Sequence, residues 1–211
     1  MLNAEAIYFL LAQSGQLNMP SEDIQAHSYP VSRRFGGEVY KICHNAMAAL
    51  GLENLKVKFL ILQSSELNAY SQYSFDDNEP HLIVIYSGLL ERCSPGELSY
   101  IIGHELGHLV FEHSVIERVL DYIYPTKDAY PPLLRITFDL WHKLAEISAD
   151  RLGLLVVRDI EPALHAMFKG SAGVDMGYFH IDCDDYITLI DKLVSKLAPA
   201  SCSDFDTHPM D

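Results

Sequence analysis

The sequence predicts an α+β domain that is mainly helical and has a small three-stranded sheet before a helix carrying the pattern His-Glu-x-x-His. Three observations support this expectation. Apolar residues recur at helical spacing in both halves of the chain, three strand-like runs lie between residues 57 and 86, and a helix-start signal stands at Ser94. Helices, then a sheet, then helices again is the order of an α+β fold.

The N-terminal part of the chain is expected to form two helices separated by a loop. Residues 3–14 predict a short helix that ends at Gly15, and residues 31–50 predict a longer one that ends at Gly51. Residues 16–30 contain prolines and predict the loop.

Three strands are expected in the middle of the chain. Residues 57–62 and 81–86 are apolar and rich in β-branched side chains. Residues 68–74 are more polar, which is typical of an edge strand, and residues 76–80 predict a turn. Because the three runs are close in sequence, we expect one small sheet.

The rest of the chain is expected to be helical. Ser94 has the features of an N-cap, with Pro95 at the first helical position and Glu97 completing a capping box. This helix is expected to run to about residue 113, and a helical pattern continues through residue 119 until Pro125. Further helices are expected at residues 133–157, 161–169 and 186–197.

Composition narrows the possible functions. The 211 residues carry a formal net charge of −14, which argues against binding to nucleic acid or to anionic membranes. No apolar stretch reaches the roughly 18 residues of a membrane span, and the N-terminal apolar run is a poor signal peptide. The four cysteines form no CxxC pair, so we expect reduced thiols in a soluble, cytoplasmic protein.

The strongest functional signal is the group His104, Glu105 and His108. Two histidines four residues apart lie on one face of a helix and can take adjacent corners of a tetrahedral zinc site. Glu105 lies about 100° further round the helix, where a carboxylate can take a proton from a metal-activated water. The alternative is an ordinary helix with two surface histidines, although the apolar run around them makes unpaired polar groups costly.

The helix expected at residues 133–157 offers a third ligand. Glu146 and Asp150 are four residues apart and share one face. A glutamate with two histidines leaves the fourth zinc position for water, and Asp150 could accept a hydrogen bond from a ligand histidine. The alternative is an exposed acidic helix face with Arg151 as a local partner.

Five groups of residues carry a resemblance to a known family. They are Asn68-Ala-Tyr, Gly88-Leu-Leu, His104-Glu-Leu-Gly-His with His113, Glu146-x-x-Ala-Asp150-Arg151, and Thr207-His208-Pro209. On these residues, over about residues 55–209, the chain resembles the M48 family of zinc metallopeptidases. The family's transmembrane helices have no counterpart here, which would fit a compact soluble member or a shortened chain.

The resemblance implies a fold and a set of roles. Residues 55–211 would form a gluzincin-like metallopeptidase domain on which a helical region, residues 1–54, packs. It implies one Zn²⁺ per chain with three protein ligands: His104, His108 and Glu146. Glu105 would be the general base and Asp150 the partner of a ligand histidine. It also implies an edge strand that receives the substrate backbone through Asn68, Ala69 and Tyr70.

Two further histidines have open roles. His113 is one residue short of the position at which some metallopeptidases place a third histidine ligand, so we expect it to support the site by a hydrogen bond to the C-terminal region. His208 could stabilise the developing oxyanion, could cap the metal as an inhibitory fourth ligand, or could belong to a flexible tail.

The leading hypothesis is a zinc-dependent metalloendopeptidase that hydrolyses peptides or unfolded proteins, with Glu105 as general base. One alternative is a latent or non-catalytic zinc-bound domain that binds peptides or a partner and is capped by its own C-terminal tail. A second alternative is an interaction module without metal.

Overall fold

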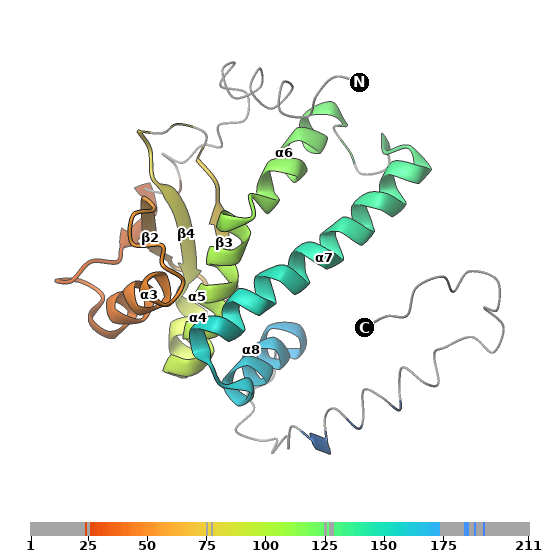
Figure 1. Cartoon of the computed structure of the whole chain (residues 1–211). Helices are drawn as coiled ribbons and strands as arrows, with labels where there is room; N and C mark the ends of the chain where they lie inside the picture. The colour runs from red at the N-terminus through yellow and green to blue at the C-terminus, as the bar shows by residue number, and fades with distance from the viewer. Residues whose placement is uncertain are drawn as a thin grey trace. The chain divides into compact units, whose positions relative to one another are not determined.

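The computed structural model describes residues 24 and 26–173, except for residues 75, 77, 125, 127 and 128, and the single positions 184, 185, 188 and 192. The chain divides into two units, Met1–Val174 and Asp175–Asp211, and the fold below is that of the first. Its described part is mainly helical with one four-stranded sheet, which confirms the α+β class (Figure 1). The helix expected at residues 3–14 lies outside the described residues, as does most of the one expected at residues 186–197.

The sheet has four strands in the order β1-β2-β4-β3, so the expected number of three is wrong. The strands β2 (Val57–Leu62), β3 (Ala69–Gln72) and β4 (His81–Tyr86) occupy the three expected runs. The additional strand β1 (Ser28–Pro30) lies in the segment expected to be a loop. It is too short to show alternation and ends at a proline, and it is recognisable only through its antiparallel pairing with β2.

The strand β3 lies at an edge of the sheet, as expected. It pairs antiparallel with β4, which in turn pairs in parallel with β2. The N–H group of Tyr86 donates to the carbonyl of Asn68 at 3.1 Å. Because hydrogen-bonded and non-hydrogen-bonded pairs alternate in an antiparallel ladder, Ala69 and Ser71 direct their backbone groups away from β4.

The core lies between one face of the sheet and two helices, α3 (Gly37–Ala49) and α5 (Pro95–Val110) (Figure 1). Its most deeply buried side chains include Ile83, Ile85, Ile102 and Leu106. A smaller apolar cluster covers the opposite face of the sheet at Leu60, Leu82 and Val84. The strand β4 is therefore covered on both faces, which explains its continuous apolar run.

Two expected helix boundaries are wrong. The helix α3 begins at Gly37 and not near residue 31, because the N–H group of Val31 continues the strand pairing by donating to the carbonyl of Phe59 at 2.9 Å. The helix that begins at Pro95 ends at Val110. A new helix, α6 (His113–Ile123), follows a break at which Glu112 has a left-handed φ of 53°.

The remaining helices frame the site. A short α4 (Ser87–Arg92) precedes α5, and α7 (Pro132–Val157) and α8 (Ile160–Ala172) match the two further helices expected in this region. The second half of α7 packs on α5, whereas its first half exposes Leu133 and Ile136. Within the described part of the chain, no helix has the length and apolar character that a membrane crossing requires.

Candidate metal centre

The helix α5 is held by a complete capping box at its start. The hydroxyl of Ser94 accepts from the N–H group of Glu97 at 3.3 Å, and the Glu97 carboxylate accepts from the N–H group of Ser94 at 2.6 Å. Lys169 of α8 donates to both oxygens of Glu97, at 2.9 and 3.0 Å. These contacts fix the first turn of α5, and His104, Glu105 and His108 follow two turns later on the same rigid element.

Glycines allow α5 and α7 to approach closely. A Cβ atom built on Gly107 would lie 2.9 Å from the Cα atom of Ala149. One turn away, a Cβ atom on Gly103 would lie 2.9 Å from the Cα atom of Gly153. The crossing of the two helices is therefore tight at both turns, and it places Glu146 and Asp150 opposite the two histidines of α5.

Three potential ligand atoms converge at this crossing. The Nε2 atoms of His104 and His108 are 3.0 Å apart. The carboxylate of Glu146 lies 3.5 Å from Nε2 of His104 and 3.8 Å from Nε2 of His108. Within the described residues, these side chains form the one group of three or more that could hold a metal ion, with all ligand atoms within 4.8 Å of one another.

The orientation of His104 is fixed by Asp150 and Tyr100. Oδ1 of Asp150 lies 2.9 Å from Nδ1 of His104, and the hydroxyl of Tyr100 donates to the same oxygen at 2.6 Å. With the Nδ1–H group of His104 donating to this carboxylate, Nε2 can present its lone pair toward Glu146. Asp150, which we predicted to be the partner of a ligand histidine, thus contacts His104.

The orientation of His108 is fixed by a second hydrogen-bonded chain. Nδ1 of His108 lies 3.0 Å from Nδ1 of His113, and Nε2 of His113 lies 3.2 Å from the hydroxyl of Ser148. That hydroxyl donates to the carbonyl of Ala145 at 2.8 Å. One assignment satisfies all three contacts: His108 donates to His113, and His113 donates to Ser148. It leaves Nε2 of His108 as an acceptor facing Glu146.

The described hydrogen-bond partners of His113 are thus His108 and Ser148, and the C-terminal region to which we expected a bond lies almost entirely outside the described residues. The break after α5 explains the contact with His108. Five residues along a continuous helix would turn His113 about 140° away from His108. The left-handed φ of Glu112 interrupts the helix, and His113 lies at the start of the next helix within 3.0 Å of His108.

Burial and nearby charge shift the pKa values of the cluster. Burial lowers the pKa of His104, but hydrogen bonds to Asp150 and Glu146 outweigh it and raise the pKa to about 10. Burial and the charge of His104 lower the pKa of His108 to about 4. The hydrogen bond to His104 lowers the pKa of Glu146. At neutral pH the Glu146 carboxylate is therefore ionised and His108 neutral, which are the forms that ligate a metal, whereas His104 would have to release a proton when a metal binds.

The donor set fits a tetrahedral zinc ion. Ligand atoms about 2.0–2.2 Å from a tetrahedral Zn²⁺ lie about 3.3–3.5 Å from one another. The three distances of 3.0, 3.5 and 3.8 Å bracket this spacing. Two imidazole nitrogens and a carboxylate oxygen are also a set that Zn²⁺ accepts in catalytic sites.

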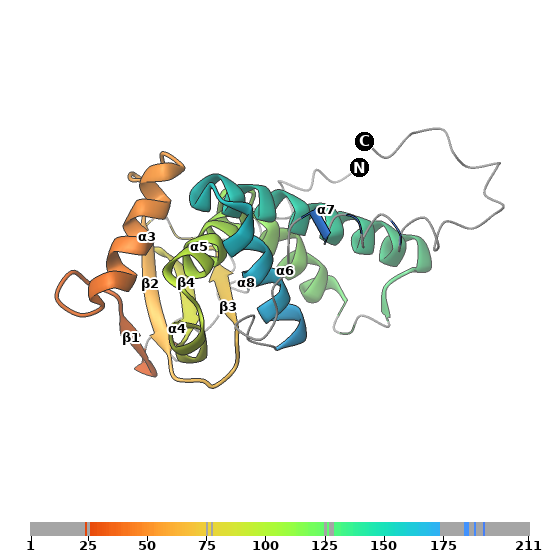
Figure 2. The same ribbon diagram turned by 90° about the horizontal axis from the view of Figure 1, so that it is seen from below.

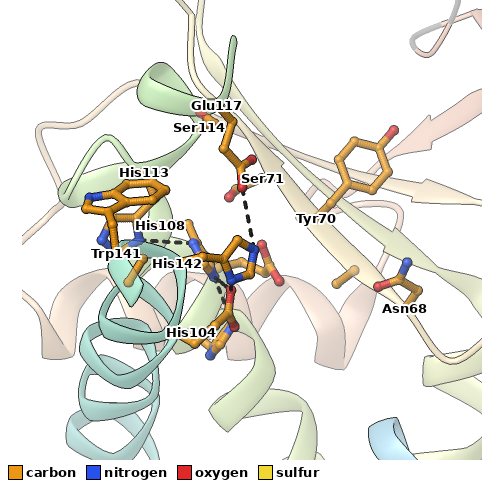
Figure 3. A pocket seen from close by; sticks show the side chains of 14 residues that line it. Asn68, Tyr70, Ser71, His104, His108, His113, Ser114, Glu117, Trp141 and His142 are labelled. Carbon is orange, nitrogen blue, oxygen red and sulfur yellow. Dashed lines mark hydrogen bonds and ion pairs between the residues drawn. The ribbon is translucent and has the colours of Figure 1, made fainter. Parts of the chain in front are cut away.

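Glu105 lies beside the cluster in the wall of a cavity of about 340 Å³. Figure 3 shows His104, His108, His142 and Ser71 around the same cavity. The side chain of Glu105 is buried, which raises its pKa, while the charge of His104 and hydrogen bonds from Ser71 oppose the rise. Ser71 belongs to the edge strand β3. The carboxyl group of Glu105 therefore lies between the candidate metal ligands and the open edge of the sheet.

The three residues expected to bind substrate lie at this edge, but they face different ways. Asn68, Ala69 and Tyr70 all border the cavity. Ala69 packs toward the main core, whereas the ring of Tyr70 packs in the cluster on the opposite face of the sheet. Figure 3 shows Tyr70 directed away from the histidines. Ser71, which the sequence did not single out, faces Glu105 instead.

Three other cavity residues were also missed. His142 of α7 lies 3.8 Å from the carboxylate of Glu146 and 3.6 Å from that of Glu117 in α6. The ring of Trp141 lies edge-on to His113, with the ring centres 5.9 Å apart. The spacing of four residues between His142 and Glu146 was a usable signal, whereas nothing local marks Glu117 or Trp141. His208 lies outside the described residues.

Comparisons with known proteins agree with this geometry. The sequence model of Peptidase family M48 matches residues 35–130, which include His104, Glu105 and His108. A plastoglobule-localized metallopeptidase 48 of Arabidopsis thaliana chloroplasts is 29% identical over 120 residues, which cover 54% of this chain and 34% of the relative. Metalloprotease YcaL of Escherichia coli (strain K12) is 29% identical over 189 residues, which cover 84% of this chain and 66% of that protein.

The chain thus spans about a third of one relative and just under two thirds of the other. Both relatives are named as metallopeptidases or metalloproteases, and the matched family is a family of peptidases. The two histidines and the glutamate that converge here are a metal-binding set that suits such an enzyme. The chain is therefore similar to peptidase family M48 over residues 35–130, and to two relatives named as metallopeptidase or metalloprotease.

Proposed function

We propose that this protein is a zinc-dependent endopeptidase and that His104, His108 and Glu146 hold the metal ion. The convergence of these three side chains beside the buried carboxyl group of Glu105 is the observation that carries the proposal. When bound, the zinc ion supplies a Lewis acid that polarises the scissile carbonyl group and activates a water.

Glu105 is the residue placed to move protons. Of the three cavity glutamates, Glu146 contacts the ligand histidines and Glu117 contacts His142, while Glu105 faces Ser71 at the strand edge. There it can take a proton from the attacking water and pass it to the leaving amine. Its side chain is buried, so it has little contact with bulk water.

The substrate is an extended peptide segment. Ala69 and Ser71 direct backbone groups away from β4, so a peptide can pair with β3 as an additional strand. Backbone pairing of this kind selects peptides by their extended conformation and not by their sequence. It favours unfolded proteins, because the strands of folded proteins are already paired.

The test is the substitution Glu105→Gln, which keeps the size of the side chain and removes its basicity. Casein cleavage should fall about 10²–10⁴-fold, while zinc content measured by atomic absorption stays at one ion per chain. Full cleavage by this variant with zinc present would exclude Glu105 as the general base. Loss of zinc in His108→Ala, together with loss of cleavage, would link the metal to the activity.

The alternative is a latent zinc-bound domain in which the C-terminal tail occupies the fourth coordination position of the metal. Two observations support this alternative. The cluster supplies three ligands and leaves a fourth metal position, and the tail contains His208 within the sequence Thr207-His208-Pro209. Removing residues 199–211 should raise casein cleavage if the tail inhibits. It should lower cleavage if His208 takes part in the reaction.

A further inference from the structure

A second cavity of about 120 Å³ lies beside the one that contains the metal centre. Its walls come from the start of β3 and from α4, α5 and α8; β3, α4 and α8 lie next to one another in Figure 2. The two cavities share Asn68, Ala69 and Glu105. A peptide that lies along β3 next to Glu105 therefore reaches the openings of both cavities.

The walls of the second cavity are mostly apolar. They include Leu67, Leu89, Ile101 and Ala166, with Gly170 at the rim. Leu89 and Ala166 are buried, and Ile101 stands three residues before His104 on the same helix. An aliphatic side chain placed here would exchange water for carbon contacts on several sides.

Two wall residues are ionisable: Glu105, which the cavity shares with the metal site, and Lys169, whose charge is already neutralised. The ammonium group of Lys169 donates to the carbonyl of Arg92 at 2.6 Å and to the Glu97 carboxylate at 2.9 and 3.0 Å. Its ammonium group is therefore hydrogen-bonded to groups of the protein itself. Lys169 therefore gives the cavity no electrostatic reason to select an acidic side chain.

The size of the cavity limits what can enter. In another protein, a cavity of about 150 Å³ lined by aliphatic and aromatic side chains holds one benzene molecule. A volume of about 120 Å³ suits a side chain of three or four heavy atoms, such as valine, leucine or methionine. The two rings of tryptophan exceed it.

We propose that this cavity is the specificity pocket of the enzyme and that it binds a medium-sized aliphatic side chain of a residue flanking the cleaved bond. The inference rests on the proposed peptidase function. The pocket would give the enzyme a sequence preference, whereas pairing with the strand edge selects only for an extended conformation.

Gly170 allows the pocket to be narrowed without disturbing the fold. A Cβ atom at Gly170 would meet no heavy atom within 4 Å. Leucine is also a better helix former than glycine. Gly170→Leu should therefore fold normally and place its side chain at the mouth of the pocket. Ser171→Leu is the matched control, because Ser171 is exposed on the same helix and does not line the cavity.

The first experiment is cleavage of a peptide library, read by mass spectrometry. In the unmodified chain, one position flanking the cleaved bond should favour leucine over alanine about tenfold or more in kcat/KM. Gly170→Leu should abolish or reverse this preference, and Ser171→Leu should leave it unchanged. Ile101→Ala should enlarge the pocket and raise the cleavage of peptides with phenylalanine at that position. Cleavage by Gly170→Leu with an unaltered preference would overturn the proposal while leaving the peptidase function intact.

The second experiment measures binding and does not need turnover. The probes are an alanine heptapeptide with one central leucine and its all-alanine counterpart, each labelled with a fluorophore and titrated with zinc-loaded Glu105→Gln chain. The leucine peptide should bind about tenfold more tightly, and the difference should vanish when Gly170→Leu is added. Equal binding of the two peptides would overturn the proposal that the cavity binds an aliphatic side chain, even if the chain cleaved no peptide.

Discussion

Asp150 connects two parts of the site through one oxygen atom. Its Oδ1 accepts from the hydroxyl of Tyr100 at 2.6 Å and lies 2.9 Å from Nδ1 of His104. Burial raises the pKa of Asp150, but the hydrogen bonds to His104 and Tyr100 outweigh it and lower the pKa. Asp150 thus acts as a fixed anion that sets the direction of a candidate metal ligand.

Asp150→Asn is therefore expected to weaken zinc binding about 10–100-fold. The amide keeps the shape of the side chain but loses the charge that orients His104. Competition with a chromophoric chelator measures the Kd for zinc. Asp139→Asn removes the same charge from an exposed position on the same helix and should leave the Kd unchanged. Equal affinities in the two variants would contradict the role of Asp150.

At the scale of single residues, local spacing predicted what lies on one helix and missed what the fold brings together. His104 with His108, and Glu146 with Asp150, are visible because four residues make one helical turn. Ser71 and Glu117 approach the site only through the packing of other elements. His142 could have been found by the same four-residue rule, applied to Glu146.

At the scale of elements, the crossing of α5 and α7 decides whether the ligands meet. One tight contact is at Gly107, where an added Cβ atom would lie 2.9 Å from the Cα atom of Ala149. Ala149 adjoins Asp150 and is three residues from Glu146. Any separation of the helices at this point therefore moves the ligand carboxylate away from both histidines.

Gly107→Ala should lower zinc affinity about tenfold or more, because a separation of a few tenths of an ångström alters the ligand geometry. Zinc titration measures the loss of ligand geometry, and the Tm of the zinc-free chain shows whether the fold is also destabilised. Gly170→Ala is the control: it meets no heavy atom within 4 Å and should be neutral or stabilising by about 0.4–1 kcal/mol. If both variants bound zinc equally well, the tight crossing would have no role in the site.

A buried ion pair joins α8 to the start of α5. Lys169 and Glu97 are each 4% exposed, and their charged atoms lie 2.9 Å apart. Lys169→Met should lower the free energy of unfolding by about 3–5 kcal/mol, since it leaves the carboxylate buried without its partner. Urea denaturation measures the change.

Adding Glu97→Gln to Lys169→Met should restore part of the lost stability. Glutamine removes the isolated charge and can still complete the capping box with Ser94. A double variant no more stable than Lys169→Met would show that the loss comes from packing and not from the unpaired charge.

At the scale of the whole molecule, the order of elements and the edge position of β3 were predictable, and the junctions were not. Regular patterns marked β2, β4 and α7 because their buried faces repeat over many residues. The strand β1 and the break at Glu112 depend on distant partners and on a single backbone angle. Neither leaves a periodic signal in the sequence.

Chelation of the metal should affect the whole domain and a specific optical signal. With free zinc at about 1,000 times its Kd, binding stabilises by about 4 kcal/mol, so removal should lower Tm by about 8–16 °C. The single tryptophan, Trp141, contacts His113, which in turn contacts His108, so its fluorescence should change with zinc removal and return on addition. Unchanged Tm and emission after verified zinc loss would contradict a metal at this site.

The division of the ligands between α5 and α7 has a consequence for the docking of the two helices. A metal bridging His108 and Glu146 closes a loop of about 40 residues, as a cross-link would. It can do so only after α7 has docked on α5, so it selects chains that have already folded. A metal held by both helices would therefore favour the docked arrangement over any arrangement in which the helices are apart.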